Sequence, residues 1–361
     1  MSKQKDLSDI RKQIDSLDEQ IQLLLNERAS CAQRVAEVKQ AAGEKVNFYR
    51  PEREADILRV VQERNKGPLS NEEIARLFRE IISACLALEE VLKIAFLGPE
   101  GTFTQAAALK HFGHSVDTVS LAAIDEVFRE VESGAAHYGV VPVENSTEGV
   151  VSHTLDMFVQ TSLKICGEVE LRIHHHLLST EKDLSAIKKV YSHQQSLGQC
   201  RRWLDSHLPH AELVAVSSNA EAAKLSANDP ASAAIASDSA AEIYKLDTIS
   251  ANIEDEPDNT TRFLIIGSQT VEPSKSDKTS LLISADNKTG ALQRLLTPLS
   301  DHGISLTRIE SRPSRRGMWD YVFFVDIEGH IKDGTVAKAL SDLEKETSLF
   351  KVLGSYPRAV L

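Results

Sequence analysis

The hydrophobic pattern of this chain changes at Leu92, and this change most limits what the chain can fold into. From residue 6 to about residue 93, apolar residues recur with helical spacing, and after Leu92 short apolar runs alternate with helical stretches. Helical stripes and sheet faces are buried in different kinds of layer, so the two parts belong to different domains. The 361 residues suffice for two or three domains. We therefore expect a multidomain protein with a first boundary near residue 93.

Residues 1–93 are expected to form an all-α helical domain. Breaks at "AAGEKVNFYRP" and "NKGPLS" end the first and second helices. Pro51 suits the first turn of the second helix, and Ser70 with Glu73 predicts a capping box for the third. A bundle of one long helix and two shorter ones is too thin to bury the apolar faces of its helices, so we expect the domain to dimerise. The apolar stripe of the long helix consists of Ile10, Ile14, Leu17, Ile21, Leu24 and Leu25.

Residues 94–270 are expected to form an α/β domain. The runs "KIAFLG", "YGVVPV", "KKVYSH", "SAAIAS" and "TRFLIIG" are typical of buried strands, and helical stretches separate them. This alternation predicts a parallel sheet. Residues 174–245 look like an inserted second lobe, which would leave a cleft between two lobes.

Residues 279–361 follow the polar linker "GSQTVEPSKSDK" and show the order βαββαβ. This order predicts a ferredoxin-like α+β domain at the C-terminus.

Composition narrows the function classes. The net charge of −12 argues against nucleic acid or an anionic membrane as a partner. Residues 1–93 hold 16 Lys/Arg and 17 Asp/Glu, and no apolar run approaches the roughly 18 residues of a membrane span. The N-terminus has no apolar core of a signal peptide. Cys31, Cys85, Cys166 and Cys200 are scattered without a Cys-x-x-Cys pair, which favours reduced thiols in the cytoplasm.

Cations lie on or beside the buried stripe of the first helix. Arg28 and Lys39 fall on it, and Arg11 lies near its start. Three such cations are costly unless an anion meets them, which favours a polyanion pocket. The alternative is that these long side chains reach solvent.

The segments "IRKQIDSLDEQIQLLLNER", "RVAEVK", "YRPERE" and "LFREIISACLALEE" resemble the all-helical chorismate mutase family over residues 6–92. The resemblance implies that Arg11 and Arg28 bind substrate carboxylates, one of them from the partner protomer. It also implies that Lys39 binds the ether oxygen and a carboxylate, that Arg53 orients the site, and that Glu54 holds the substrate hydroxyl.

This sequence departs from the family pattern at three positions. Arg50 stands where Asp is frequent, Cys85 replaces a frequent Ser, and Glu89 replaces a frequent Gln. A carboxylate cannot donate a hydrogen bond to the ether oxygen as Gln does, so Glu89 would have to act in its protonated form.

Four loops that follow or precede strands carry polar side chains. "GPEGTFTQAA" (98–107) contains Thr102, and "DNTTRFLIIG" (258–267) contains Thr261 and Arg262. The other two loops supply Asn145, Ser146, Ser192, His193 and Gln195. None shows a Ser-His-Asp pattern or a metal set. For "HHH" (174–176), we favour structural histidines over zinc, because successive residues of a strand face opposite sides and at most His174 and His176 share a face.

The motifs "GPEGTFT", "VENSTEG", "SHQQSLGQC" and "TTRF" occur in series and resemble prephenate dehydratase over about residues 94–268. The resemblance implies two lobes similar to periplasmic binding proteins and a substrate, prephenate, that loses water and carbon dioxide together. Thr261 matches the catalytic threonine, which would donate a proton to the leaving hydroxyl. Arg262 would grip the anion or brace the loop. The alternative is that "NTTR" is a polar turn. The residues implied to orient the substrate are Thr102, Asn145, Ser146, Ser192, His193 and Gln195.

The tail resembles the ACT regulatory domain through "TGALQRLLTPLSDHGI" and "ESRPSRRGMWDYVFF". The resemblance implies phenylalanine as the effector, because its binding motifs match Gly290, Ala291, Leu292, Glu310, Ser311, Arg312 and Pro313. The alternative is a simple dimerisation domain.

The three resemblances together imply a homo-oligomeric enzyme, a dimer or dimer of dimers. It would rearrange chorismate to prephenate, convert prephenate to phenylpyruvate and respond to phenylalanine. No metal or organic cofactor is implied. Two rivals are a two-lobed ligand sensor with a helical dimerisation arm and a transcription regulator, and the near-neutral helical segment counts against the second.

Overall fold

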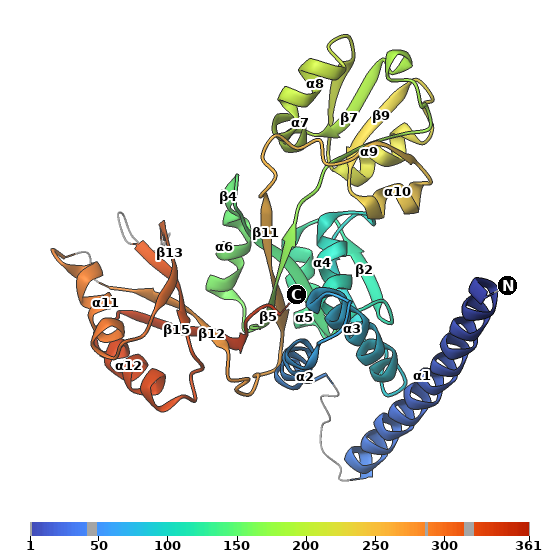
Figure 1. The fold of residues 1–361 in the computed structure, drawn as a ribbon. Helices are drawn as coiled ribbons and strands as arrows, with labels where there is room; N and C mark the ends of the chain where they lie inside the picture. Colours follow the sequence, from blue (N-terminus) through green and yellow to red (C-terminus); the bar gives the residue numbers. More distant parts are fainter. Residues whose placement is uncertain (1, 42–48, 286–287, 314–320, 361) are drawn as a thin grey trace.

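The computed structural model describes residues 2–41, 49–285, 288–313 and 321–360. Figure 1 shows helices at the N-terminal end, two stacked α/β lobes in the centre and a further α/β unit at the C-terminal end. Within these described ranges, the search for a helix with the length and hydropathy of a membrane span finds none.

The N-terminal helices are α1 (Ser2–Ala41), α2 (Pro51–Arg64) and α3 (Asn71–Ala87), as expected. Pro51 opens α2, and the Ser70 hydroxyl caps α3 by accepting from the Glu73 backbone N–H at 3.1 Å. The Glu73 carboxylate forms an ion pair with Arg76.

Helix α1 extends away from the rest of the chain (Figure 1). It packs against α3, where Arg28 lies 3.5 Å from the Ile81 carbonyl oxygen. The apolar stripe is solvent-exposed in this single chain: Leu17 is 55% exposed and Leu24 is 64% exposed. Apolar residues at helical spacing need a partner surface, and this chain does not cover them.

The first central sheet has the order β2-β1-β3-β11-β5, with β4 paired to β3. Strand β1 is parallel to β2 and β3, whereas β11 is antiparallel to β3 and β5. The expectation of a parallel sheet was therefore wrong, because β5 and β11 carry the chain out to the second lobe and back. The strands are β1 (Lys93–Leu97), β2 (Asp117–Leu121), β3 (Tyr138–Asn145), β4 (Gly149–Val150), β5 (Lys164–Arg172) and β11 (Thr260–Gly267), and the helices are α4 (Phe103–Phe112), α5 (Ile124–Glu132) and α6 (Ser152–Gln160).

The second lobe contains a mixed sheet with the order β10-β6-β9-β7-β8. Strand β10 ends at Ser250, so the lobe extends beyond the expected 174–245. Residues 173–175 and 251–259 connect the two lobes. The strands are β6 (His176–Ser179), β7 (Lys189–His193), β8 (Glu212–Val216), β9 (Ser232–Ala236) and β10 (Asp247–Ser250), and the helices are η1 (Leu184–Ala186), α7 (Gln194–Gln199), α8 (Arg201–His207), α9 (Asn219–Ser226) and α10 (Asp238–Tyr244).

The C-terminal unit has the expected βαββαβ order and an antiparallel sheet, β13-β14-β12-β15. One face of this sheet shares an apolar cluster with the central domain, in which Phe324 and Leu353 join Phe158 and Ile165. The unit is thus built onto the first lobe. Its elements are β12 (Asp277–Ser284), α11 (Ala291–Asp301), β13 (Leu306–Pro313), β14 (Tyr321–Glu328), α12 (Gly334–Lys345) and β15 (Leu349–Pro357).

Candidate active sites

A pocket of about 970 Å³ lies among the N-terminal helices and brings most of the expected residues together. Its cations come from α1 and α2, so a polyanion would meet positive charge from two sides. Arg11 does not line it, because it lies on α1 about 25 Å along the axis from Arg28 at ~1.5 Å per residue. Within one chain the two arginines cannot bind the same small molecule. The expected residues that line the pocket are Arg28, Lys39, Arg53, Glu54, Cys85 and Glu89.

Glu54 is engaged by a residue that the sequence reasoning did not single out. It is 7% exposed and forms an ion pair with Arg79 of α3, which is equally buried. Burial lowers the pKa of Arg79. The expectation that Glu54 simply holds a substrate hydroxyl is therefore modified, since its carboxylate is shared with Arg79.

Glu89 lies in the turn after α3, which ends at Ala87, and still reaches the pocket. Burial raises the pKa of Glu89, and Lys39 opposes this with a smaller effect. The net upward shift extends the pH range in which the carboxyl is protonated, and the protonated form is the one that can donate a hydrogen bond.

A second cleft, of about 640 Å³, lies between the two lobes of the central domain. Loops from both lobes meet there, as the four sequence motifs predicted. The expected residues that line it are Thr102, Asn145, His193, Gln195 and Thr261.

Ser146 and Ser192 are not among the residues that line the cleft, and they support the loops instead. The Ser146 hydroxyl accepts from the Thr260 backbone N–H at 2.9 Å. Ser192 is fully buried and donates to the Ile235 carbonyl oxygen at 3.1 Å. The expectation that they orient substrate carboxylates is corrected, because their polar groups are turned toward the protein.

Arg262 also lies outside the cleft. Successive strand residues face opposite sides, so Thr261 faces the cleft and Arg262 faces the C-terminal unit. Arg262 donates to Glu168 at 2.8 Å, Asp326 at 2.7 Å and Tyr356 at 3.0 Å. Its guanidinium points away from the cleft and braces the interface between the first lobe and the C-terminal unit.

Thr261 is 8% exposed and is held by Asn145. The Asn145 Oδ1 accepts from the backbone N–H groups of Thr147 and Glu148, both at 3.0 Å. Its amide N–H group therefore faces Thr261 and donates to Oγ1 at 2.7 Å. A hydroxyl that accepts this bond keeps its own proton to donate. Among the described residues, none takes that proton.

Among the polar residues of the cleft that sequence reasoning missed, three form a connected group. Asn259, Gln199 and His175 line the cleft, and Gln199 Oε1 contacts His175 Nε2 at 2.8 Å and Asn259 Nδ2 at 3.1 Å. Gln199 stands at the end of the motif "SHQQSLGQC", so its place there was a usable signal. The expectation that His174 and His176 share a face is confirmed by their stacked rings, and it leaves His175 on the other side.

Helix N-termini, rather than charged side chains, supply positive charge to the cleft. Among the described residues that line it, none is Lys, Arg, Asp or Glu. Thr102 caps α4 and Ser218 caps α9, and both residues line the cleft. Helix N-termini carry partial positive charge and free N–H groups, so these two ends favour a carboxylate.

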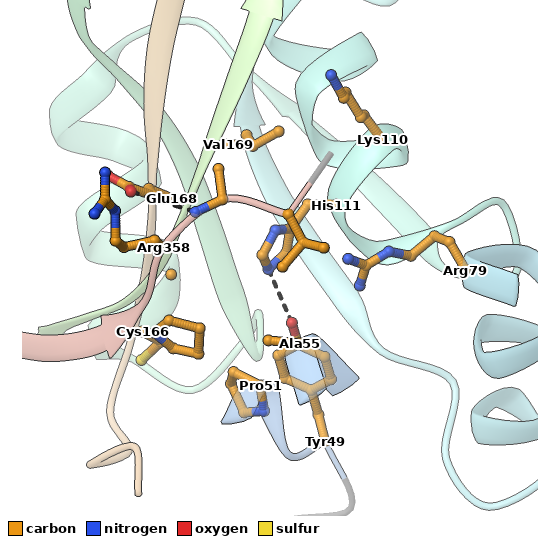
Figure 2. Close-up of a pocket in the computed structure, with 14 residues that line it drawn as sticks. Tyr49, Pro51, Ala55, Arg79, Lys110, His111, Cys166, Glu168, Val169 and Arg358 are labelled. Atoms are coloured by element: carbon orange, nitrogen blue, oxygen red, sulfur yellow. Dashed lines mark hydrogen bonds between the residues drawn. The ribbon is translucent and has the colours of Figure 1, made fainter. Parts of the chain in front are cut away.

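A small cavity lies where the three regions of the chain meet (Figure 2). Its volume of about 30 Å³ leaves room for about one water molecule. The Tyr49 hydroxyl and His111 Nε2 lie 2.8 Å apart, which joins the helical region to α4. Burial raises the pKa of Tyr49 and lowers that of His111 well below its usual value. Tyr49 also lines the helical pocket, so this small cavity adjoins that pocket.

The two expected effector motifs lie at one end of the C-terminal unit in the view of Figure 1. Gly290 caps α11 with a left-handed φ of 76°, and Leu292 is 41% exposed. The segment Glu310–Pro313 ends β13, where Arg312 binds Asp156 of the central domain at 2.9 Å. Both motifs adjoin residues outside the described ranges, namely 286–287 and 314–320.

Metal ligands do not gather in the described part of the chain. A search there for three or more His, Cys, Asp or Glu side chains that could hold one ion finds no group.

Comparison with family models divides the chain into three matches. Residues 10–90 match chorismate mutase type II, residues 94–271 match prephenate dehydratase, and residues 279–345 match the ACT domain. The chain is 60% identical to a bifunctional chorismate mutase/prephenate dehydratase from Stutzerimonas stutzeri, over 100% of both chains.

Solved structures also resemble the central and C-terminal regions. A prephenate dehydratase from Arthrobacter aurescens in complex with L-Phe is 35% identical, with a TM-score of 0.69, over 74% of this chain and 90% of that one. GqqA, described as a quorum-quenching acylase, is 27% identical with the same TM-score of 0.69, over 74% of this chain and 98% of that one. Because proteins with two different activities share this fold, the fold alone does not identify the activity. The 60% identity over the whole chain does.

Proposed function

This chain belongs to the bifunctional chorismate mutase/prephenate dehydratase family, and we propose from the site geometry which residues carry each reaction. It has both enzyme domains followed by an ACT domain. The mutase reaction belongs to the helical pocket and the dehydratase reaction to the cleft between the lobes.

In the helical pocket, Arg28 and Lys39 bind the carboxylates and ether oxygen of chorismate. The reaction is a pericyclic rearrangement, so it needs a compact conformer and positive charge opposite the breaking C–O bond, with no nucleophile. Arg11 of the partner subunit completes the pocket. The exposed stripe on α1 supports this arrangement, because a second copy of the helix would cover it. We place the homo-oligomer in the cytoplasm, which suits the four free cysteines.

In the cleft, Thr261 donates its proton to the hydroxyl that leaves prephenate. The ring carboxylate departs as carbon dioxide, and its bonding electrons make the ring aromatic as the hydroxyl leaves as water. One proton is consumed, and solvent returns it to Thr261. The observation that carries this role is the Asn145 N–H donated to Thr261 Oγ1, which leaves the threonine proton free.

The full chain supplied with chorismate, and separately with prephenate, tests the proposal. Phenylpyruvate should appear after a lag in which prephenate accumulates. Chorismate that is consumed without phenylpyruvate formation would reject the role of the cleft, and prephenate that is consumed without chorismate turnover would reject the role of the helical pocket.

Phenylalanine regulates the dehydratase through the ACT domain in this proposal. The support is the related prephenate dehydratase described in complex with L-Phe, together with the motifs at Gly290–Leu292 and Glu310–Pro313. Leu292 and Ser311 are exposed, so Leu292→Ala and Ser311→Ala should leave the fold intact and weaken inhibition severalfold. Unchanged inhibition in both variants would place the effector elsewhere.

A further inference from the structure

A series of hydrogen-bonded side chains connects the first lobe to the second. The donor and the acceptor of each bond can be assigned by starting at Asn145. Backbone N–H groups can only donate, so the bonds from Thr147 and Glu148 fix the Asn145 oxygen toward them. The Asn145 nitrogen must then face Asn259, which presents Oδ1 to it at 2.8 Å. The orientation of Asn259 is therefore set by Asn145.

The same logic continues into the second lobe. With Oδ1 of Asn259 facing Asn145, its nitrogen donates to Gln199 Oε1 at 3.1 Å. Gln199 Oε1 also lies 2.8 Å from His175 Nε2. An oxygen needs a donor there, so the imidazole of His175 carries its proton on Nε2.

His175 is almost completely buried, and its environment favours the uncharged ring. It is 1% exposed, its ring contacts the edge of Phe103 at a centroid distance of 5.6 Å, and burial lowers its pKa. Its Nδ1 atom is buried without a hydrogen-bond partner among the described residues. A proton on Nδ1 would gain no acceptor from them, which agrees with the neutral ring.

We propose that His175 is a positioning residue of the dehydratase: as the neutral Nε2–H tautomer, it holds Gln199 with its oxygen inward and its amide N–H groups free for the substrate. One of these N–H groups lies 3.4 Å from Glu148 Oε1, a long contact that an anionic ligand can replace. Without His175, Gln199 can turn and set its N–H against that of Asn259. That clash would disturb Asn145 and, through it, Thr261.

The place of His175 in the fold suits this role. It lies on the outgoing connection between the lobes, Asn259 lies on the returning one, and Gln199 ends α7 of the second lobe. The hydrogen bonds therefore hold the two walls of the cleft in a fixed relation. A misplacement of about 1 Å can cost on the order of 100-fold in rate.

Two matched substitutions test the proposal. Gln extends its amide nitrogen toward the position of Nε2, whereas the shorter Asn reaches only about as far as Nδ1. We expect His175→Asn and His175→Leu to lower dehydratase kcat/KM at least tenfold, and His175→Gln to recover most of the loss. Mutase activity of the same chain should stay unchanged, which reports an intact helical domain, and an unchanged thermal unfolding curve reports that the central domain of each variant folds. Equal activities of the Gln and Asn variants would overturn the proposal.

A second measurement reports the tautomer directly. Long-range ¹H–¹⁵N NMR of the histidine rings should show His175 protonated at Nε2 and bare at Nδ1 near neutral pH. Protonation at Nδ1 alone would reverse the hydrogen-bond direction and reject the inference.

The inference rests on the proposed dehydratase site. One reference variant, Thr261→Ala, distinguishes a failure of the inference from a failure of the proposed site. If Thr261→Ala is inactive on prephenate while all His175 variants are active, the site stands and the role of His175 is rejected. If Thr261→Ala is fully active, the proposed site itself is wrong.

Discussion

Arg262 donates a hydrogen bond to Asp326 at 2.7 Å and thereby ties the strand that carries Thr261 to the ACT domain. Strand β3, next to β11, shows the same arrangement. Its Glu144 precedes Asn145 and forms an ion pair with Arg308 of the ACT domain at 3.0 Å. Thr261 and Asn145 face each other across β11 and β3, and Arg262 and Glu144 do so one position further. Thr261, the proposed proton donor, and Asn145, which donates to it, are thus each adjacent to a residue bound by the ACT domain.

Asp326→Asn should weaken this connection. Burial raises the pKa of Asp326, but Arg262 and Ser280 together lower it by more, so the native carboxylate is charged. We expect phenylalanine inhibition to weaken severalfold, on the scale of ~1–3 kcal/mol of coupling. Dehydratase activity without phenylalanine should change less than this, because Glu168 still binds Arg262.

Calorimetry of phenylalanine binding to Asp326→Asn shows whether weaker inhibition comes from lost coupling between the domains or from lost affinity for phenylalanine. Asp342→Asn is the matched control, since Asp342 forms ion pairs on the surface of the same domain. Wild-type inhibition in Asp326→Asn would show that the signal takes another route.

Thr261→Val should lower dehydratase kcat by about 10²–10⁴-fold, the usual contribution of a positioned acid. Valine keeps the shape of threonine but has no proton to donate. Thr261→Ser should remain active, because it retains the hydroxyl, and mutase turnover should be unaffected in both proteins. Near-normal prephenate turnover by the valine variant would place the proton donor elsewhere.

Arg11→Ala and Arg28→Ala should each abolish mutase activity, and a mixture of the two chains should recover part of it. In a two-fold symmetric dimer, one of the two sites in each mixed dimer keeps both arginines. Random exchange should therefore restore about a quarter of the wild-type rate, an estimate from that symmetry. Arg11→Ala mixed with itself is the control. A mixture that stays inactive while dimers form would mean that each site is built within one chain.

Mutase kcat/KM should decline as pH rises through the pKa of Glu89. Burial raises this pKa and Lys39 lowers it by less, so the net shift is upward. The protonated form is complete below the raised pKa and is lost above it, and the catalytic hydrogen bond is lost with it. Glu89→Gln should remove the decline, whereas Glu90→Gln, outside the pocket, should keep it. A flat wild-type profile would remove Glu89 from the mechanism.

Tyr49→Phe should destabilise the junction of the three regions. It leaves the buried His111 Nε2 without the hydroxyl at 2.8 Å, and an unsatisfied buried group costs roughly 1–3 kcal/mol. Tyr321→Phe removes a hydroxyl from a side chain that is 40% exposed and should change stability by less than about 0.5 kcal/mol. Chemical denaturation measures both, and equal values would show that the Tyr49–His111 contact adds no stability.

Local sequence determined the helices, the βαββαβ order and most of the cleft-facing loops. Helical spacing and the Pro51 and Ser70 signals depend on residues close in the chain, so α1, α2 and α3 could be predicted. The same holds for Thr261, because a polar cluster directly precedes an apolar strand. Strand direction could not be predicted in this way, since the antiparallel position of β11 depends on the path through the second lobe.

Tertiary structure decided which of two adjacent polar residues serves the cleft and which serves a domain interface. Thr261 and Arg262 are both hydrogen-bonding residues of one short motif, and only the orientation of β11 turns one toward the cleft and the other toward Asp326. Glu54 and Arg79, and likewise Gln199 and His175, meet across long stretches of chain. Hydrogen bonds and ion pairs act over a few ångströms in space, and the spacing of residues along the chain does not reveal them until the elements have packed.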